Sequence, residues 1–248
     1  MDITRDDIKL FMRALVAQTN KHKSAFKYLT FESGIKMLAN ANVQFTRGDA
    51  LNDNEDCNIC KCDMSKPIMI LKSLGIADAI INREIQKKRD EISRFGICSF
   101  GTRANNDILW KRYASEDNIR EDGVCIELNL KTVIDDFFNS NEKITALLVR
   151  YVADVKQIIP WDLFTGSPED RILFAYLLFS TKNKMQWSDE EELRLIWPNM
   201  LDDRYLRCSI DKKCFKAVYY GRDMSIKQRK ELGIVLNRKF PRIKRVFR

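Results

Sequence analysis

The chain has 248 residues, of which 45% are hydrophobic and 31% are charged, and its formal net charge is +8. This composition excludes a disordered, collagen-like or linker-rich protein, and the length fits one large domain that buries its own core. No segment approaches the about 20 consecutive apolar residues of a membrane span, and the start of the chain is acidic where an export signal is basic. We therefore expect a cytoplasmic protein without a membrane partner.

The hydrophobic patterns, taken in chain order, predict a single α+β domain over residues 1–248, with a mixed or antiparallel sheet and flanking helices. Several strand-like segments follow one another near the C-terminus without a helix between them, which argues against a doubly wound parallel sheet. Residues 1–24 are expected to form a helical extension and residues 238–248 a basic strand. The expected helices are 4–19, 33–41, 67–93, 107–114, 131–138, 169–183 and one starting after Ser225, and the expected strands are 26–31, 43–46, 95–100, 123–129, 146–152, 191–197, 205–210, 215–220 and 243–247.

The positive charge is unevenly spread. The segment Arg238–Arg248 contains six basic residues and no acid. Such a segment can neutralise phosphates, so a non-catalytic nucleic-acid-binding module is one alternative function. A solvated basic face on a final strand is the plainer interpretation.

Two clusters of candidate metal ligands occur between residues 53 and 62. Cys57 and Cys60 have the spacing of zinc ligands, but no second Cys-x-x-Cys pair exists and the chain has one histidine. We therefore expect free thiols at Cys57, Cys60 and Cys62 and no metal. The acids Asp53, Glu55 and Asp56 leave open a carboxylate-based nuclease or hydrolase with a divalent ion, although turn formation explains them as well.

Phosphate-loop, dinucleotide-turn and nucleophile-elbow signatures are absent, so any catalysis would depend on carboxylates, hydroxyls, amides and cations. Glu190, Glu192 and Arg194 have the period-two spacing that places side chains on one side of a strand. Two carboxylates and a guanidinium can hold a ribose hydroxyl and stabilise positive charge on a sugar carbon. An exposed, charge-paired strand face is the alternative, and both interpretations place these carboxylates outside the apolar core. Ser99 ends a buried-looking strand, where ligands often bind.

Eight short motifs follow one another between about Lys27 and Gly221. They are Lys27-Tyr28-Leu29, Leu51-Asn52-Asp53, Ile97-Cys98-Ser99-Phe100, Leu109-Trp110-x-x-Tyr113-Ala114, Gly123-x-Cys125-Ile126-Glu127, Val149-x-Tyr151, Trp187-x-x-Glu190-x-Glu192-x-Arg194 and Val218-Tyr219-Tyr220-Gly221. In this order they resemble the bacterial family catalogued as domain of unknown function 2971. The resemblance covers most of the chain and carries no assigned activity with it.

The layout is also similar, more distantly, to that of ADP-ribosyltransferases, which are α+β enzymes that split NAD at the nicotinamide–ribose bond. This resemblance implies that Glu192 steadies the oxocarbenium-like transition state and that Glu190 orients the acceptor. It implies an NAD site formed by Lys27, Tyr28, Ser99, Arg194, Trp110 and Tyr113. The implied acceptor is a nucleic acid or a protein, and the implied setting is a toxin or phage-defence effector with an antitoxin among its candidate partners.

Two departures from the ADP-ribosyltransferase pattern are visible. Lys27-Tyr28 stands where an arginine or histidine is expected, which bears on affinity for NAD. The central strand reads Cys98-Ser99-Phe100-Gly101 in place of Ser-Thr-Ser, which bears on the shape of the cleft.

Overall fold

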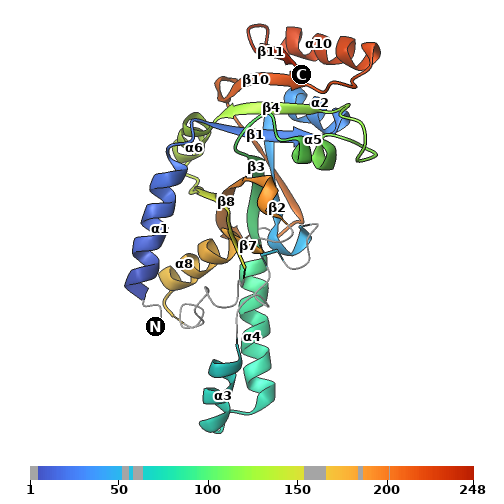
Figure 1. The fold of residues 1–248 in the computed structure, drawn as a ribbon. Helices are drawn as coiled ribbons and strands as arrows, with labels where there is room; N and C mark the ends of the chain where they lie inside the picture. Colours follow the sequence, from blue (N-terminus) through green and yellow to red (C-terminus); the bar gives the residue numbers. More distant parts are fainter. Residues whose placement is uncertain (1–4, 52–55, 58–63, 154–165, 184–186, 201) are drawn as a thin grey trace.

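The strands and helices of the computed structural model are described for residues 5–51, 56–57, 64–153, 166–183, 187–200 and 202–248 (Figure 1). The strands are β1 (Ser24–Leu29), β2 (Asn42–Arg47), β3 (Phe95–Gly101), β4 (Val124–Asn129), β5 (Thr145–Leu148), β6 (Arg150–Val152), β7 (Thr181–Asn183), β8 (Glu192–Met200), β9 (Tyr205–Ser209), β10 (Phe215–Tyr220) and β11 (Lys244–Phe247). The helices are α1 (Arg5–Thr19), α2 (Phe31–Asn40), α3 (Ser65–Ser73), α4 (Asp78–Ser93), α5 (Asp107–Tyr113), α6 (Leu130–Asn139), α8 (Pro168–Phe179) and α10 (Ile226–Lys239). Short 3-10 turns, η1 (Gly48–Ala50), η3 (Ser188–Glu190) and η4 (Lys212–Cys214), lie between them.

A nine-stranded mixed sheet runs through the molecule in the order β11-β10-β4-β1-β3-β2-β9, and β8 lies beside this path between β3 and β5. The pairing of β10 with β11 is parallel, and the other pairings in this sheet are antiparallel. Strands β6 and β7 form a separate parallel pair. The structure thus confirms a single compact α+β fold with a mixed sheet and flanking helices.

Successive residues of a strand point to opposite faces of the sheet, and helices pack against both faces. On β8, Leu195 enters a core that α2, α6 and α10 close with residues such as Leu38, Val133 and Leu232. The next residue, Ile196, enters a second core formed with α1 and α8. A third, smaller cluster lies under α5 and is centred on Trp110.

The predicted helix of residues 169–183 is found as α8, which ends at Phe179. It begins at a complete capping box between Ser167 and Asp170, with Pro168 in the first turn. Its residues from Phe174 to Phe179 are almost all buried, as its all-round apolar pattern predicts. The C-terminal part of the predicted range instead forms β7, which leaves Lys182 on a strand.

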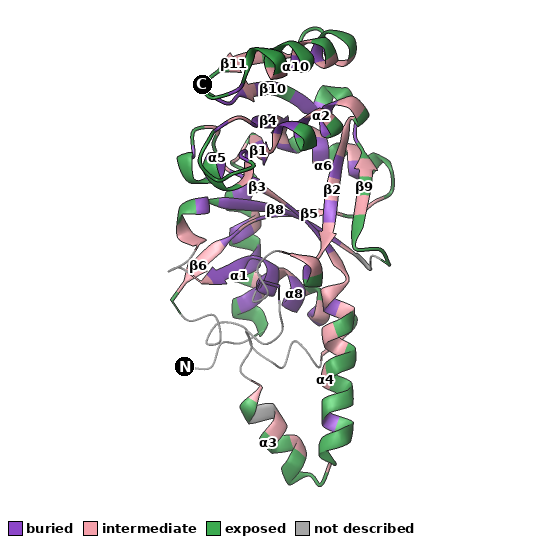
Figure 2. Cartoon of the chain, turned by 90° about the vertical axis from the view of Figure 1, so that its right-hand side faces the viewer, coloured by how far each residue is buried: buried purple, intermediate pink, exposed green. Residues whose placement is uncertain are grey.

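Several predicted boundaries differ from the structure. The N-terminal segment is not an extension, because Ile8, Met12 and Leu15 of α1 are buried in the second core. The basic C-terminal strand is confined to β11, because α10 continues through Lys239. The predicted helix over residues 67–93 is two helices, since Gly75 adopts a left-handed φ of 77° at the turn between them. These two helices, α3 and α4, form an arm that projects from the body (Figures 1 and 2).

No helix among the described residues is both long and apolar enough to cross a bilayer.

Candidate functional site

A cleft lies where the central strands of the sheet part. Strands β1 and β3 share one registered pair, Phe26 with Gly101, whereas β3 and β8 pair along their whole common length. Residues of both parted strands, together with α2, β2 and β9, line a cavity of ≈ 720 Å³. This volume falls within the range of small-molecule sites, roughly 300–1,000 Å³.

Most of the site residues predicted from the sequence line the cleft. Its lining includes Lys27, Tyr28, Ser99, Tyr113, Glu190, Glu192 and Arg194. Trp110 is the exception and is not among the lining residues. Its ring is fully buried under α5, and its Nε1–H donates a 2.8 Å hydrogen bond to the Ala104 carbonyl. Trp110 is therefore a core residue, and the structure does not place it where it would touch a ligand in the cleft.

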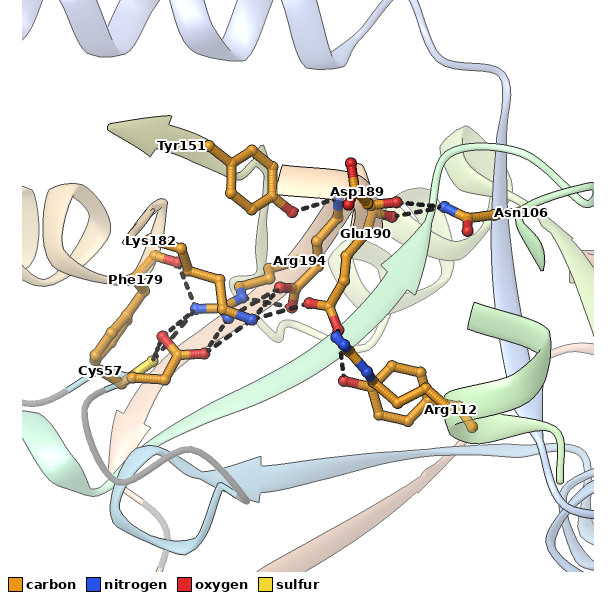
Figure 3. Close-up of polar contacts among 12 residues, drawn as sticks. Cys57, Asn106, Arg112, Tyr151, Phe179, Lys182, Asp189, Glu190 and Arg194 are labelled. Carbon is orange, nitrogen blue, oxygen red and sulfur yellow. Dashed lines mark hydrogen bonds and ion pairs between the residues drawn. The ribbon is translucent and has the colours of Figure 1, made fainter. Parts of the chain in front are cut away.

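Arg194 is the centre of a buried ion network on the cleft floor (Figure 3). Its Nε donates to Oε1 of Glu192 over 2.7 Å, and its Nη1 donates to Oδ1 of Asp56 over 3.1 Å. Nη2 contacts both carboxylates, and Nη1 also donates to the Phe179 carbonyl. All guanidinium nitrogens are thus bound, which explains how this side chain can be 1% exposed.

Lys182 joins the three carboxylates of this network. Its Nζ lies 3.0 Å from Oε2 of Glu192, 3.1 Å from Oε2 of Glu190 and 3.5 Å from Oδ2 of Asp56. The ammonium group of Lys182 also faces the ring of Trp187, with Nζ 4.6 Å from the ring centroid. One ammonium group therefore links every acid on the cleft floor.

Glu190 is held from the opposite side by α5. Its Oε1 accepts hydrogen bonds from Nη1 of Arg112 and from the Tyr113 hydroxyl, each over 2.8 Å. Burial, and then the neighbouring Glu190 charge, raise the pKa of Tyr113, so its hydroxyl remains a donor at neutral pH. Both oxygens of Glu190 are bound in this arrangement.

The exposed-face interpretation of the Glu190–Arg194 segment is wrong. Glu190 is 2% exposed and Glu192 is 6% exposed, so both carboxylates are enclosed. The strand alternation holds for Glu192 and Arg194 on β8, but Glu190 ends the η3 turn. Glu191, between them, has a left-handed φ of 47°, and this turn brings Glu190 to the cleft. The period-two spacing therefore identified three residues that line the cleft, although only Glu192 and Arg194 lie on a strand.

The network keeps Glu192 and Arg194 ionised. Burial acts to raise the pKa of Glu192, but the charges of Arg194 and Lys182 outweigh it and lower this pKa. Burial acts to lower the pKa of Arg194, but Asp56 and Glu192 raise it well above its usual value. The enclosed groups are three carboxylates against two cations, which leaves one formal negative charge on the floor. Arg112, whose side chain is 38% exposed, balances it from the rim.

The residues of β1 bridge the parting strands. Lys27 Nζ donates to the Ser99 carbonyl over 2.7 Å and lies 5.2 Å from the centroid of the Phe100 ring. The Tyr28 hydroxyl donates to the Arg103 carbonyl over 2.6 Å. A Cβ at Gly101 would lie 2.7 Å from Leu109 and 3.0 Å from Tyr28, so glycine permits this close approach.

Two members of the network are not predicted from the sequence to lie beside Glu190, Glu192 and Arg194. No hydrophobic period in the sequence predicts the position of Lys182, because this residue lies on the three-residue strand β7 that follows α8. The sequence predicts a turn residue or a metal ligand at Asp56, and in the structure Asp56 pairs with Arg194. Lys36 of α2 and Arg207 of β9 also line the cleft and add positive charge there.

The metal-ligand clusters are only partly described. Cys57 is buried, and its Sγ lies 3.4 Å from Nη1 of Arg194. Cys60, Cys62, Asp53 and Glu55 lie outside the described residues, so the free-thiol and metal hypotheses for them stay predictions. Within the described ranges, no group of three or more His, Cys, Asp or Glu side chains is arranged to hold a metal ion.

Asn106 ties the Glu190 turn to α5. Its Oδ1 caps the helix by accepting from the Ile108 and Leu109 amides, and its Nδ2 donates to the Asp189 carbonyl over 2.7 Å. We expect Asn106→Asp to keep the cap, lose the donor and set a carboxylate against a carbonyl. Unsatisfied buried groups cost about 1–3 kcal/mol, so the free energy of unfolding should fall by about that amount.

The matched control for this prediction is Asn129→Asp. Asn129 caps α6 through the same acceptor oxygen, which binds the Thr132 amide. An aspartate caps a helix as well as an asparagine, so the control should change stability by less than about 0.5 kcal/mol. Urea unfolding of both variants measures the difference. Equal effects at the two positions would mean that the Nδ2 bond of Asn106 contributes nothing.

No protein-family model matches the chain, and no curated protein or solved structure does so either.

Proposed function

We propose that this protein is an ADP-ribosyltransferase-like enzyme that cleaves NAD in the cleft between β1 and β3. The observation that carries the proposal is Glu192, an ionised carboxylate that lines the cleft and is fixed by Arg194 and Lys182. A preorganised charge in an enclosed site stabilises developing opposite charge more strongly than water does. The distant resemblance to ADP-ribosyltransferases supports the choice of reaction by analogy.

The reaction breaks the bond between the nicotinamide nitrogen and the ribose carbon. The bonding electron pair leaves with nicotinamide, which becomes neutral, and positive charge develops on the ribosyl carbon. A nucleophile on the acceptor, or water, then bonds to this carbon and releases a proton. The ionised carboxylate of Glu192, which Arg194 and Lys182 hold in place, favours that cationic transition state.

The remaining lining groups support the two ends of such a substrate. The cations Lys27, Lys36 and Arg207 line the cleft and would attract the pyrophosphate. Ser99 and Tyr28 would contact the cofactor across the gap between the strands. Glu190, which lies beside Arg112 and Tyr113, is the group we propose to orient the acceptor. The acceptor is proposed to be a macromolecule, in keeping with a toxin or phage-defence effector that an antitoxin restrains.

Binding of NAD is tested by filling the cleft. Ser99 is half-buried on the cleft wall, so Ser99→Tyr places a ring where the substrate would lie. We expect calorimetry to show NAD binding to the wild type at millimolar concentration or below and a loss of at least roughly ten-fold in affinity for the variant. Ser73→Tyr, an exposed position on α3, is the control and should bind as the wild type does.

Nicotinamide release, with and without cell extract as the acceptor source, tests the chemistry. Absence of both heat and nicotinamide in the wild type would refute the proposal. Heat of NAD binding without release of nicotinamide would retain the cleft as a nucleotide-binding site and refute the proposed enzymatic activity.

A further inference from the structure

The positive charge of the molecule is concentrated at one end of the fold. Residues 215–248, which form β10, α10 and β11, contain eleven Lys and Arg against two Asp and Glu, a net charge of +9. The other 214 residues contain 32 basic and 33 acidic residues, a net charge of −1. These three elements lie together at the end of the molecule farthest from the helical arm (Figure 1). The whole excess of positive charge is therefore local.

Most of these cations are not neutralised by neighbouring acids. Lys216 pairs with Glu127, and Arg222 and Arg248 pair with Glu121 and Asp107. Among the described residues, no carboxylate lies within ion-pair distance of a second set, which we call the open cations. The open cations are Lys227, Lys230, Arg238, Lys239, Arg242 and Lys244.

The open cations follow the outer side of α10 and continue onto the edge strand. Leu232 and Leu236 are buried and hold the inner side of the helix against the core, while Lys230 and Arg238 are exposed. In Figure 2 most of α10 is coloured as exposed. At 1.5 Å per residue, α10 from Ile226 to Arg238 presents a row about 18 Å long. Such a row spans several successive phosphates of a nucleic-acid strand.

An exposed aromatic ring interrupts the basic surface. Phe247 of β11 is 65% exposed, and it is supported from below by Tyr220 at a centroid distance of 4.7 Å. The guanidinium of Arg229 lies 5.8 Å from the centroid of the Phe247 ring. A supported ring among cations is the combination that stacks an unpaired base while phosphates are bound beside it.

We infer that β10, α10 and β11 form a docking surface for single-stranded nucleic acid. The open cations bind the phosphates and Phe247 stacks a base. The exposed ring favours a single strand over a duplex, whose bases are already stacked. The surface stands apart from the cleft, and its test is independent of the proposed NAD chemistry.

The inference is tested by neutralising three open cations. The probe is a fluorescent oligothymidine of about 15 nucleotides, and the variant is Lys230→Gln/Arg238→Gln/Lys244→Gln. Each lost phosphate contact lowers the slope of log affinity against log salt by about 0.7. We expect the slope to fall by about 2 and the affinity in low salt to weaken by at least roughly ten-fold.

The control variant removes the same charge elsewhere. Arg13→Gln/Lys21→Gln/Lys87→Gln alters three exposed cations outside the basic end and lowers the formal net charge by the same amount. It should bind the probe as the wild type does. Equal weakening by the two triple variants would show that only net charge matters and would overturn the inference.

Phe247→Leu tests the stacking role, since it keeps an apolar contact with Tyr220 and removes the aromatic face. We expect roughly ten-fold weaker binding of the single strand. No loss of binding, or tighter binding of a duplex of the same length, would overturn the single-strand assignment. Binding to phosphatidylserine vesicles without binding to the oligonucleotide would instead assign the surface to membranes.

Discussion

Glu192→Gln should reduce the rate of nicotinamide release by about 10²–10³ while leaving NAD affinity nearly unchanged. The amide keeps the size of the side chain and one acceptor oxygen but removes the charge that faces the ribosyl carbon in the proposed reaction. Removing an interaction made mainly in the transition state lowers kcat and kcat/KM together. Single-turnover measurements, with calorimetry for NAD affinity, separate the two quantities.

The same substitution should also destabilise the protein. Glu192 accepts hydrogen bonds from two buried cations, and its amide replacement would point an N–H₂ group at Lys182 or Arg194. We expect the free energy of unfolding to fall by about 1–3 kcal/mol. Rates must therefore be compared well below the melting temperature of the variant, where both proteins are folded.

Glu191→Gln provides the matched control for Glu192→Gln. Glu191 is the adjacent residue, and its exposed carboxylate pairs with Arg103 over 2.9 Å. Exposed ion pairs contribute little, so both the nicotinamide-release rate and the melting temperature should stay close to those of the wild type. Equal rates for Glu192→Gln and Glu191→Gln would eliminate Glu192 as a catalytic residue.

The fold was predictable from the sequence where local patterns determine structure. The helices predicted to start near residue 169 and after Ser225 are found as α8 and α10, and both begin at complete capping boxes. The predicted boundaries are wrong where one continuous apolar or charged segment contains two secondary-structure elements. Gly75 divides a predicted helix, and the predicted strand of residues 146–152 divides into β5 and β6.

The cleft was less predictable, because its ion network joins residues far apart in the chain. The spacing of Glu190, Glu192 and Arg194 identified three of the five enclosed charged groups, yet it gave no information on their burial. Asp56 and Arg194 are 138 positions apart in the sequence, and no pattern within either segment predicts that they form an ion pair. Local periodicity identifies which residues share a face, whereas burial depends on what the rest of the chain lays over that face.

Arg194→Met should be the most destabilising single change that the cleft floor allows. It leaves Asp56 and Glu192 enclosed, with Lys182 as the remaining buried cation between them. Removing one partner of a buried ion pair costs about 3–5 kcal/mol, which is much of the stability of an ordinary domain. Arg112→Met is the comparison, because Arg112 is partly exposed and Glu190 keeps its bonds to Tyr113 and Lys182. It should lose about 1 kcal/mol or less.

The pH dependence of this difference distinguishes lost charge from lost packing. In the wild type the pKa of Glu192 is lowered, so its contribution to stability is present above its unfolded pKa and is lost as the pH falls through the folded value. In Arg194→Met, burial without the guanidinium should raise that pKa, so protonation relieves the penalty as the pH falls. The stability gap between the two proteins should therefore be largest near neutral pH and narrow toward pH 4, as measured by urea unfolding. A gap that stays constant over this range would assign the effect to packing alone and remove the electrostatic account of the network.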